Sequence, residues 1–210
     1  MINKESEILK LFSKEPWKKF TFQEIQKLTK KKSKSYLSRV LDNFTREGII
    51  LQEKIGRSLI YSLNLQFPKA KLFAGFVLED NGWNKKSIPY RDVIKVMNKI
   101  PTKNYIFLIT GSYANNTQTE KSDIDIVIMI DDPMETKKVY AELRTICELN
   151  IPKMHLYVFK NKEFIEMLKN KEANYGKEIV KKNILLYGGQ VYMQLIREAI
   201  ENGFTSKNLY

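Results

Sequence analysis

The sequence predicts an α+β protein in which a helical bridge joins two units. In residues 1–64, three apolar patterns at helical spacing precede two strand-forming runs, which indicates short helices closed by a hairpin. Residues 65–102 contain two further helical patterns and form the bridge. In residues 103–210, strand-forming runs alternate with helical patterns, which indicates a sheet packed against helices.

Positive charge is the most informative feature of the composition. The 210 residues include 36 Lys and Arg against 24 Asp and Glu, a net charge of +12. Residues 1–68 hold 14 bases and 7 acids, so the first third carries over half of the excess. A basic end favours binding to a polyanion, most simply a nucleic acid, although a generally basic proteome gives the same composition.

The composition also excludes several classes of protein. No run approaches the roughly 18 unbroken apolar residues of a membrane span, and charges interrupt the N-terminal apolar positions, unlike those of a signal peptide. The single cysteine, Cys147, excludes an internal disulfide and a cysteine zinc cluster, and it agrees with a reducing cytoplasm. We expect Cys147 to be a small buried residue of a helix.

The first two helices are defined by an apolar face and by a start signal. Ile8, Leu11 and Phe12 are spaced so that they share one face of the opening helix. Thr21 and Glu24 have the T-x-x-E spacing of a capping box, in which each side chain satisfies a free backbone N–H of the other residue. The second helix is therefore expected to start after Thr21.

A third helix is expected from about Ser33 to Glu47, where Gly48 stands at the position of a C-terminal stop. Its predicted buried stripe comprises Tyr36, Leu37, Val40, Leu41 and Phe44. The runs IILQEKI and SLIYSLN follow, and the turn at Gly56 and Arg57 joins them into a predicted hairpin.

This order of elements resembles a winged helix-turn-helix domain over residues 1–64. The resemblance implies that the third helix enters the major groove of DNA while the hairpin touches the backbone. Basic side chains suit phosphate contacts, and Ser35, Ser38 and Arg39 are the expected readers of base edges. The expected nucleic-acid-binding residues are Lys31, Lys32, Lys34, Ser35, Ser38, Arg39, Lys54 and Arg57. A solvated helix face or a protein-docking module would give the same pattern.

The bridge is expected to contain two helices, with the turn signal Asp80-Asn81-Gly82 between them. Helical spacing relates Leu72, Phe73, Phe76 and Val77 in the first helix, and Val93, Ile94 and Met97 in the second.

The second unit carries the candidate chemistry. Gly111 follows the strand-forming run YIFLIT, where glycine permits a tight turn and close approach of a phosphate, and Ser112 begins a short helix whose N–H groups favour an anion. Asp123 and Asp125 come on the next strand, and the alternation of side chains places both carboxylates on one face. Magnesium relieves the repulsion between them and shares phosphate ligands, so the pattern predicts a nucleoside triphosphate site.

Gly111-Ser112, followed by Ser122-Asp123-Ile124-Asp125-Ile126, resembles DNA polymerase β-type nucleotidyltransferases, in particular the minimal ones of bacteria and archaea. This resemblance covers roughly residues 100–160, and the later runs FIEML and NILLYGGQVY look like archaeal proteins that join the domain to a winged helix. It implies a mixed sheet with helices on one face and two magnesium ions bound by the aspartates. It also implies transfer of a nucleoside monophosphate to an acceptor hydroxyl, with Gly111, Ser112 and Ser122 binding the nucleotide.

The chain departs from that family's pattern at two places. Active members commonly have a third carboxylate on a later strand, but the matching run KMHLYVF contains no acid. His155 in this run is the candidate replacement, as a general base or weak metal ligand, or it is simply a packed histidine. Asn115 and Asn116 replace the family's arginine and glycine, which removes a phosphate contact. Glu163 is better explained by stabilisation of a helix start than as a third ligand.

Aromatic residues near the C-terminus are weaker candidates for a nucleotide site. Tyr175, Tyr187 and Tyr192 could stack on a base, although core packing is the commoner role. Gly188-Gly189 predicts a turn into a last helix rather than a phosphate loop.

Three functions follow from these patterns. The first is a nucleotidyltransferase that binds a nucleoside triphosphate with magnesium and is positioned on DNA by its winged helix. The second is a transcription regulator whose nucleotidyltransferase domain senses a ligand or mediates assembly, for example as a homodimer. The third is an antitoxin-like minimal nucleotidyltransferase that acts on a helical, toxin-like partner protein.

Overall fold

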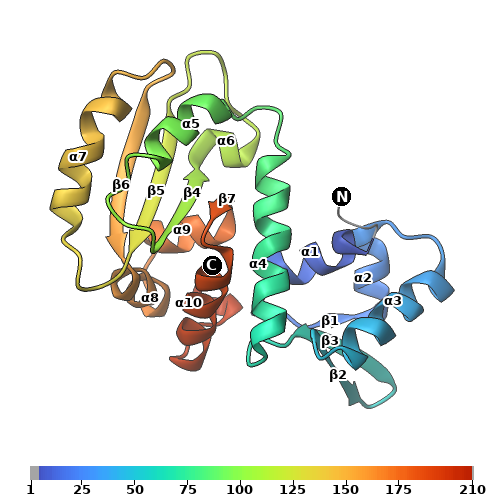
Figure 1. The fold of residues 1–210 in the computed structure, drawn as a ribbon. Helices are drawn as coiled ribbons and strands as arrows, with labels where there is room; N and C mark the ends of the chain where they lie inside the picture. The colour runs from blue at the N-terminus through green and yellow to red at the C-terminus, as the bar shows by residue number, and fades with distance from the viewer. Residues whose placement is uncertain (1–4, 210) are drawn as a thin grey trace.

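The computed structural model describes residues 5–209, and Figure 1 shows an N-terminal unit and a sheet-containing unit on either side of the long helix α4. The N-terminal unit comprises α1 (Ser6–Lys14), β1 (Phe20–Thr21), α2 (Phe22–Thr29), α3 (Lys34–Arg46), β2 (Ile50–Ile55) and β3 (Ser58–Leu63). Its three strands form an antiparallel sheet in the order β1-β3-β2. The predicted helices and hairpin are therefore present in the predicted order.

Local signals correctly placed the ends of α2 and α3. The Glu24 carboxylate accepts the Thr21 N–H at 2.7 Å, and the Thr21 hydroxyl accepts the Glu24 N–H at 3.2 Å. These bonds to Thr21 lower the pKa of the Glu24 carboxyl. Ser33 caps α3 by accepting the Tyr36 N–H, and Gly48 follows α3 with a φ of +71°, a conformation that glycine adopts without strain.

The bridge contains the two expected helices, α4 (Pro68–Trp83) and α5 (Tyr90–Met97), but the turn predicted at Asp80-Asn81-Gly82 was wrong. These residues are the last turn of α4. A Cβ atom on Gly82 would lie 2.1 Å from the carbonyl oxygen of Leu185, so glycine is needed there for close packing. A tertiary contact thus overrides the local turn preference.

The apolar face predicted for α4 was also largely wrong. Leu72, Phe73 and Phe76 are 51%, 40% and 54% exposed, whereas Val77 is buried. The face that packs inward consists mainly of small residues, namely Ala70, Ala74, Gly75 and Gly82, with Val77, Leu78 and the stem of Lys71. Small residues are used because α4 lies directly against the backbone that begins the last helix, where Gly75 meets Gly189.

The sheet-containing unit completes the chain. Its elements are β4 (Tyr105–Thr110), α6 (Gly111–Asn115), β5 (Ile124–Ile130), α7 (Thr136–Glu148), β6 (Met154–Lys160), α8 (Asn161–Lys169), α9 (Tyr175–Lys181), β7 (Ile184–Tyr187), α10 (Gly189–Glu201) and the 3₁₀ turn η1 (Ser206–Leu209). The strand order is β6-β5-β4-β7, with β5 and β6 parallel and the other two pairs antiparallel. The mixed sheet is therefore confirmed, as is the last helix that follows Gly188.

Helices cover both faces of this sheet, so the expectation of helices on one face was wrong. Alternate residues of β5 point to opposite faces. Ile126 and Ile128 pack in one core with Val93 of α5 and Leu143 of α7. Their neighbours Val127 and Met129 pack in a second core with residues of α8, α9 and α10. The β5 side chains on both faces are buried, which explains the almost uninterrupted apolar run of this strand.

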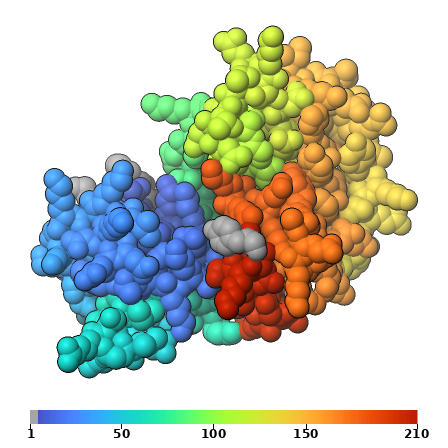
Figure 2. All heavy atoms as spheres, turned by 180° about the vertical axis from the view of Figure 1, so that it is seen from behind, coloured from blue at the N-terminus to red at the C-terminus, as the bar shows by residue number. Residues whose placement is uncertain are grey.

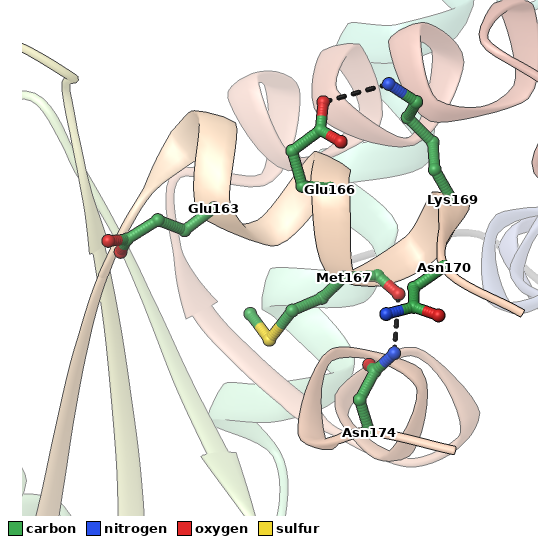
Figure 3. A pocket seen from close by; sticks show the side chains of 6 residues that line it. All are labelled: Glu163, Glu166, Met167, Lys169, Asn170 and Asn174. Atoms are coloured by element: carbon green, nitrogen blue, oxygen red, sulfur yellow. Dashed lines mark hydrogen bonds and ion pairs between the residues drawn. The ribbon is translucent and has the colours of Figure 1, made fainter. Parts of the chain in front are cut away.

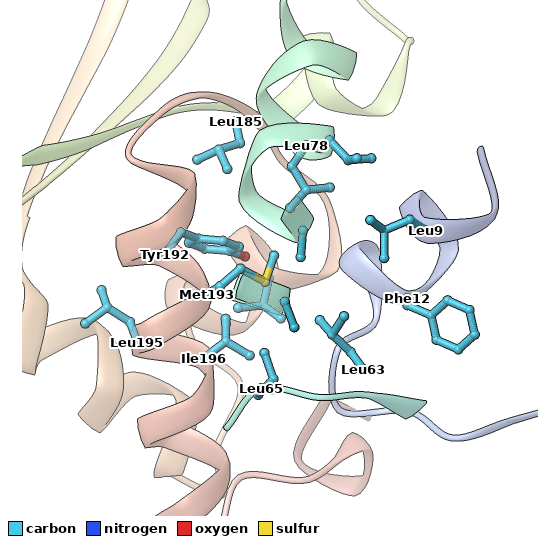
Figure 4. Close-up of a cluster of buried hydrophobic side chains, with 14 of the residues drawn as sticks. Leu9, Phe12, Leu63, Leu65, Leu78, Leu185, Tyr192, Met193, Leu195 and Ile196 are labelled. Atoms are coloured by element: carbon cyan, nitrogen blue, oxygen red, sulfur yellow. The ribbon is translucent and has the colours of Figure 1, made fainter. Parts of the chain in front are cut away.

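The N-terminal unit shares this second core with the sheet-containing unit (Figure 4). Leu9 and Phe12 of α1 lie in the same hydrophobic cluster as Leu78 of α4 and Met193 of α10. Figure 2, seen from the opposite side, shows the blue N-terminal residues in contact with the red C-terminal segment. The rings of Trp17 and Phe204 pack edge to face, with centroids 5.5 Å apart. The position of one unit on the other is therefore set by apolar packing.

Two sequence-based exclusions can be compared with the structure. Within residues 5–209, no helix is long and apolar enough to cross a membrane. Cys147 is 1% exposed in α7, and burial raises the pKa of its thiol to about 11. The prediction of a small buried cysteine is confirmed.

Candidate active site

The turn between β4 and α6 brings the backbone against one of the two aspartates. Gly111 has a φ of +62°, and a Cβ atom there would lie 1.9 Å from the Oδ2 atom of Asp125. The strand register explains the contact, because Thr110 of β4 is paired with Asp125 of β5. Any side chain at position 111 would displace the Asp125 carboxylate, so this position requires glycine for both its conformation and its space.

Both aspartates converge on His155. Its Nε2 atom lies 3.2 Å from the Oδ2 atom of Asp123, and its Nδ1 atom lies 3.5 Å from the Oδ1 atom of Asp125. The parallel pairing of β5 with β6 places Asp125 directly opposite His155. The three side chains are 39%, 25% and 45% exposed, in the order Asp123, Asp125 and His155, so the cluster is open to solvent. His155, which lies on the strand where the resembling family has an acid, thus contacts both carboxylates.

This cluster borders a cleft of about 950 Å³ between the two units. Thr110, Gly111 and Asp125 line it on the sheet side, together with Tyr157 and Tyr175. The two tyrosine rings have centroids 4.8 Å apart, and the Tyr175 hydroxyl is hydrogen-bonded to the Thr110 hydroxyl at 2.8 Å. Burial raises the pKa of Tyr175 to about 12, so its hydroxyl stays protonated at neutral pH.

The aromatic candidates have different environments. Tyr175 lines the cleft beside Asp125, whereas Tyr187 stacks on Tyr105 with centroids 4.4 Å apart. Tyr192 also borders the cleft but is only 3% exposed, and burial raises the pKa of its hydroxyl. Tyr157 was not predicted from the sequence, although it stands two residues after His155 on β6 and therefore on the same face, and that alternation could have identified it.

The predicted nucleotide-binding serines lie on opposite sides of the loop that precedes β5. Ser112 is the half-buried second residue of α6. The Ser122 hydroxyl accepts the N–H of Thr119 at 2.8 Å and so shapes the turn that leads into Asp123. Asn116 ends α6 with a φ of +56°, and its side-chain oxygen accepts a hydrogen bond from Lys85 Nζ at 3.3 Å.

Glu163 is used at the start of α8, as the sequence analysis expected. Its carboxylate accepts the Lys160 N–H at 2.7 Å, which stabilises the first turn of the helix. In Figure 3 its side chain points toward the strands and away from the Glu166–Lys169 ion pair, which has a length of 2.8 Å. The hollow shown there, about 580 Å³ between α8 and α9, also contains Asn174, whose amide donates to the Met167 carbonyl at 2.7 Å.

The expected nucleic-acid-binding residues lie on the outer surface of the N-terminal unit. All of them are exposed except Lys31, which is half-buried: Lys31, Lys32, Lys34, Ser35, Ser38, Arg39, Lys54 and Arg57. The guanidinium of Arg39 lies 5.6 Å from the centre of the Tyr36 ring. Lys54 and Arg57 flank the turn between β2 and β3, so they are separated from α3 along the chain but belong to the same unit.

The carboxylate oxygens of Asp123 and Asp125 are donors of the kind that magnesium prefers. Within the described residues there is no group of three or more His, Cys, Asp or Glu side chains that could hold a metal ion by themselves. Magnesium is commonly held by one or two carboxylates together with substrate phosphates and water, so Asp123 and Asp125 fit its needs when a phosphate compound is present.

Comparisons with known proteins agree with this geometry. Residues 91–187 match the family model of the nucleotidyltransferase domain. The match starts in α5 and ends with β7, so it contains the whole four-stranded sheet and both Asp123 and Asp125. One solved structure, described as a toxin-antitoxin with AMP-PNP, aligns with 18% identity and a TM-score of 0.40, covering 54% of this chain and 86% of that chain. No curated protein matches the chain.

Proposed function

We propose that the protein transfers a nucleoside monophosphate from a nucleoside triphosphate to an acceptor hydroxyl. The observation that carries the proposal is the convergence of Asp123 and Asp125 beside the Gly111 turn, at the edge of a cleft large enough for a nucleotide. In the reaction the acceptor oxygen forms a bond to the α-phosphorus, and the bond from that phosphorus to the oxygen of the β-phosphate breaks. Pyrophosphate leaves, and the hydroxyl proton passes to His155 or to water.

Asp123 and Asp125 would hold magnesium, which supplies positive charge to the phosphate oxygens as negative charge develops on them. Gly111 keeps the turn close against the Asp125 carboxylate, because any side chain at position 111 would displace that carboxylate. Tyr157 and Tyr175 border the same cleft and offer aromatic surfaces to a base.

Calorimetry with ATP, CTP, GTP and UTP, each with and without magnesium, tests the proposal on the full-length chain. We expect at least one triphosphate to bind only when magnesium is present, and the α-phosphate label of that nucleotide to appear on an added acceptor. If none of the four binds with magnesium, and no label is transferred, the transferase proposal is wrong.

We propose in addition that the N-terminal unit binds DNA as a winged helix. The order helix, strand, helix, helix and hairpin, with strand order β1-β3-β2, supports this assignment. The outer side of α3 is polar and basic, while its inner side packs in the core through Leu37, Val40 and Leu41. An exposed helix of this kind next to a basic hairpin suits groove entry with phosphate contacts on both sides.

Lys34→Gln and Arg39→Gln should each weaken binding to duplex DNA and reduce the dependence of log K on log salt by about one, because each removes one phosphate-neutralising charge. Fluorescence anisotropy at salt concentrations from about 50 to about 200 mM measures both the DNA affinity and its salt dependence. Lys137→Gln on α7 is the matched control, since Lys137 is exposed on the other unit. If all three variants lose DNA affinity equally, the binding is a general effect of net charge and the winged-helix proposal is wrong. Specific DNA binding without nucleotide binding would favour the regulator over the transferase.

A further inference from the structure

One wall of the cleft that contains Asp125 is formed by the N-terminal unit. Lys14, the last residue of α1, lines the cleft together with residues 15–17. Gly111 and Asp125 line it from the sheet. Residues that lie outside the matched nucleotidyltransferase domain therefore face the candidate active site.

Lysine side chains are concentrated in this cleft. The lysines that line it are Lys14, Lys85, Lys181 and Lys182. Lys85 follows α4, and its ammonium donates to Asn116 at the end of α6. Among the described residues, none of the ion pairs joins Lys14 or Lys85 to a carboxylate.

Lys14 and Lys85 come from different parts of the sequence but line the same cleft. Partial burial lowers the pKa of Lys14, and the neighbouring charges of Lys10 and Lys85 lower it further, while Glu7 acts in the opposite direction. Two ammonium groups held together in a cleft are stabilised when an anion enters between or beside them.

The short helix α6 connects this pair of lysines with the aspartate site. Its first residue, Gly111, touches Asp125, and Asn116, directly after its last residue, accepts the hydrogen bond from Lys85. At a helical rise of about 1.5 Å per residue, these two points are roughly 7 Å apart along the helix axis. A linear polyanion that begins at Asp125 and follows α6 therefore ends near Lys85, and Lys14 lines the same cleft.

We propose that Lys14 and Lys85 bind the β- and γ-phosphates of the nucleoside triphosphate, so that α1 of the N-terminal unit completes the nucleotide site. This inference rests on the proposed nucleotidyl transfer. It adds a ligand-binding role for the N-terminal unit, besides DNA binding, and it assigns to these two lysines the pyrophosphate that leaves in the reaction. Each lysine donates charge-assisted hydrogen bonds to phosphate oxygens.

The test is calorimetry on the full-length chain with the tightest-binding triphosphate and its di- and monophosphate, all with magnesium. Lys14→Gln and Lys85→Gln should each weaken triphosphate binding about tenfold, a typical cost for loss of a charge-assisted contact, and should leave monophosphate binding unchanged. Lys27→Gln is the matched control, because Lys27 is an exposed lysine of α2 in the same unit. Its affinities should equal those of the wild type.

The outcomes separate this inference from the proposed function. If the wild type binds no triphosphate, the proposed function fails and the inference fails with it. If the wild type binds but both lysine variants bind equally well, or lose monophosphate binding to the same extent, only the assignment of the lysines is overturned. Unchanged triphosphate binding combined with weaker binding of a single-stranded oligonucleotide would also overturn it, because the lysines would then serve the acceptor. Thermal unfolding of each variant shows whether the fold is kept.

Discussion

Asp125→Asn should slow nucleotidyl transfer by about a thousandfold while the protein stays folded. Asparagine has the shape of aspartate, so it fits beside Gly111 and opposite His155 without repacking. It lacks the negative charge that we propose for magnesium binding, and such a charge contributes several kcal/mol to the stabilisation of phosphoryl transfer. A thousandfold change in rate corresponds to about 4 kcal/mol.

Rates of label transfer and the magnesium dependence of triphosphate binding measure this effect. Glu142→Gln provides the control, since it removes an exposed carboxylate from α7, a helix that packs on the opposite face of the sheet from the α8–α10 core. We expect the control to retain the wild-type rate. Wild-type activity in Asp125→Asn would show that this carboxylate is not needed, and the domain would then be better explained as a ligand-sensing part of a DNA-binding protein.

The sequence predicts those parts of the fold whose causes are local. Thr21 and Glu24 define the start of α2 because both partners of the capping box lie within one turn. The predicted turn at Gly82 was wrong because the space for a glycine there is set by the Leu185 carbonyl, about a hundred residues further along the chain. The exposure of Phe73 and Phe76 has the same origin, since the backbone of the last helix occupies the other side of α4.

Residue spacing predicted only the part of the candidate site that a single strand defines. Asp123 and Asp125 are two residues apart, so strand geometry alone places them together. That His155 contacts both carboxylates depends on the register between β5 and β6, which spacing does not give. Lys14 could not be found from the sequence, because its place in the cleft depends on how the N-terminal unit packs on α4 and α10.

The replacement of the family's arginine also shows that contacts from distant segments cannot be predicted from a local motif. Asn116 stands where the resembling family has a glycine, next to Asn115 in place of its arginine, and the sequence therefore predicted the loss of a phosphate contact. The structure places the ammonium of Lys85 at the Asn116 side chain, so a cation is present at this position but comes from the segment after α4. A comparison of sequence motifs detects a cation only when it occupies the same position in the motif, so it does not detect one that comes from another segment.

Gly75→Ala should lower the free energy of unfolding by about 3 kcal/mol or more, although alanine favours helix formation over glycine by about 1 kcal/mol. A Cβ atom on Gly75 would lie 2.3 Å from the carbonyl carbon of Gly189 and 2.6 Å from the backbone nitrogen of Gln190, atoms that cannot rotate away. The two helices would have to separate, and the bond from the Gly189 N–H to the half-buried Glu79 carboxylate, 2.5 Å long, would be weakened.

For a chain of this size, a loss of that order lowers the midpoint of thermal unfolding by roughly 10 °C. Leu72→Ala on the exposed side of α4 is the control; leucine and alanine both favour helices, so this change hardly alters helix propensity and brings no new backbone contact, and its midpoint should stay within about 2 °C of the wild type. The sign of the change in the unfolding midpoint of Gly75→Ala shows which effect is larger, the helix propensity or the backbone contact. A stabilised Gly75→Ala would mean that helix propensity prevails and that α4 does not lie against the start of α10, in which case the N-terminal unit would also lose its fixed position over the cleft.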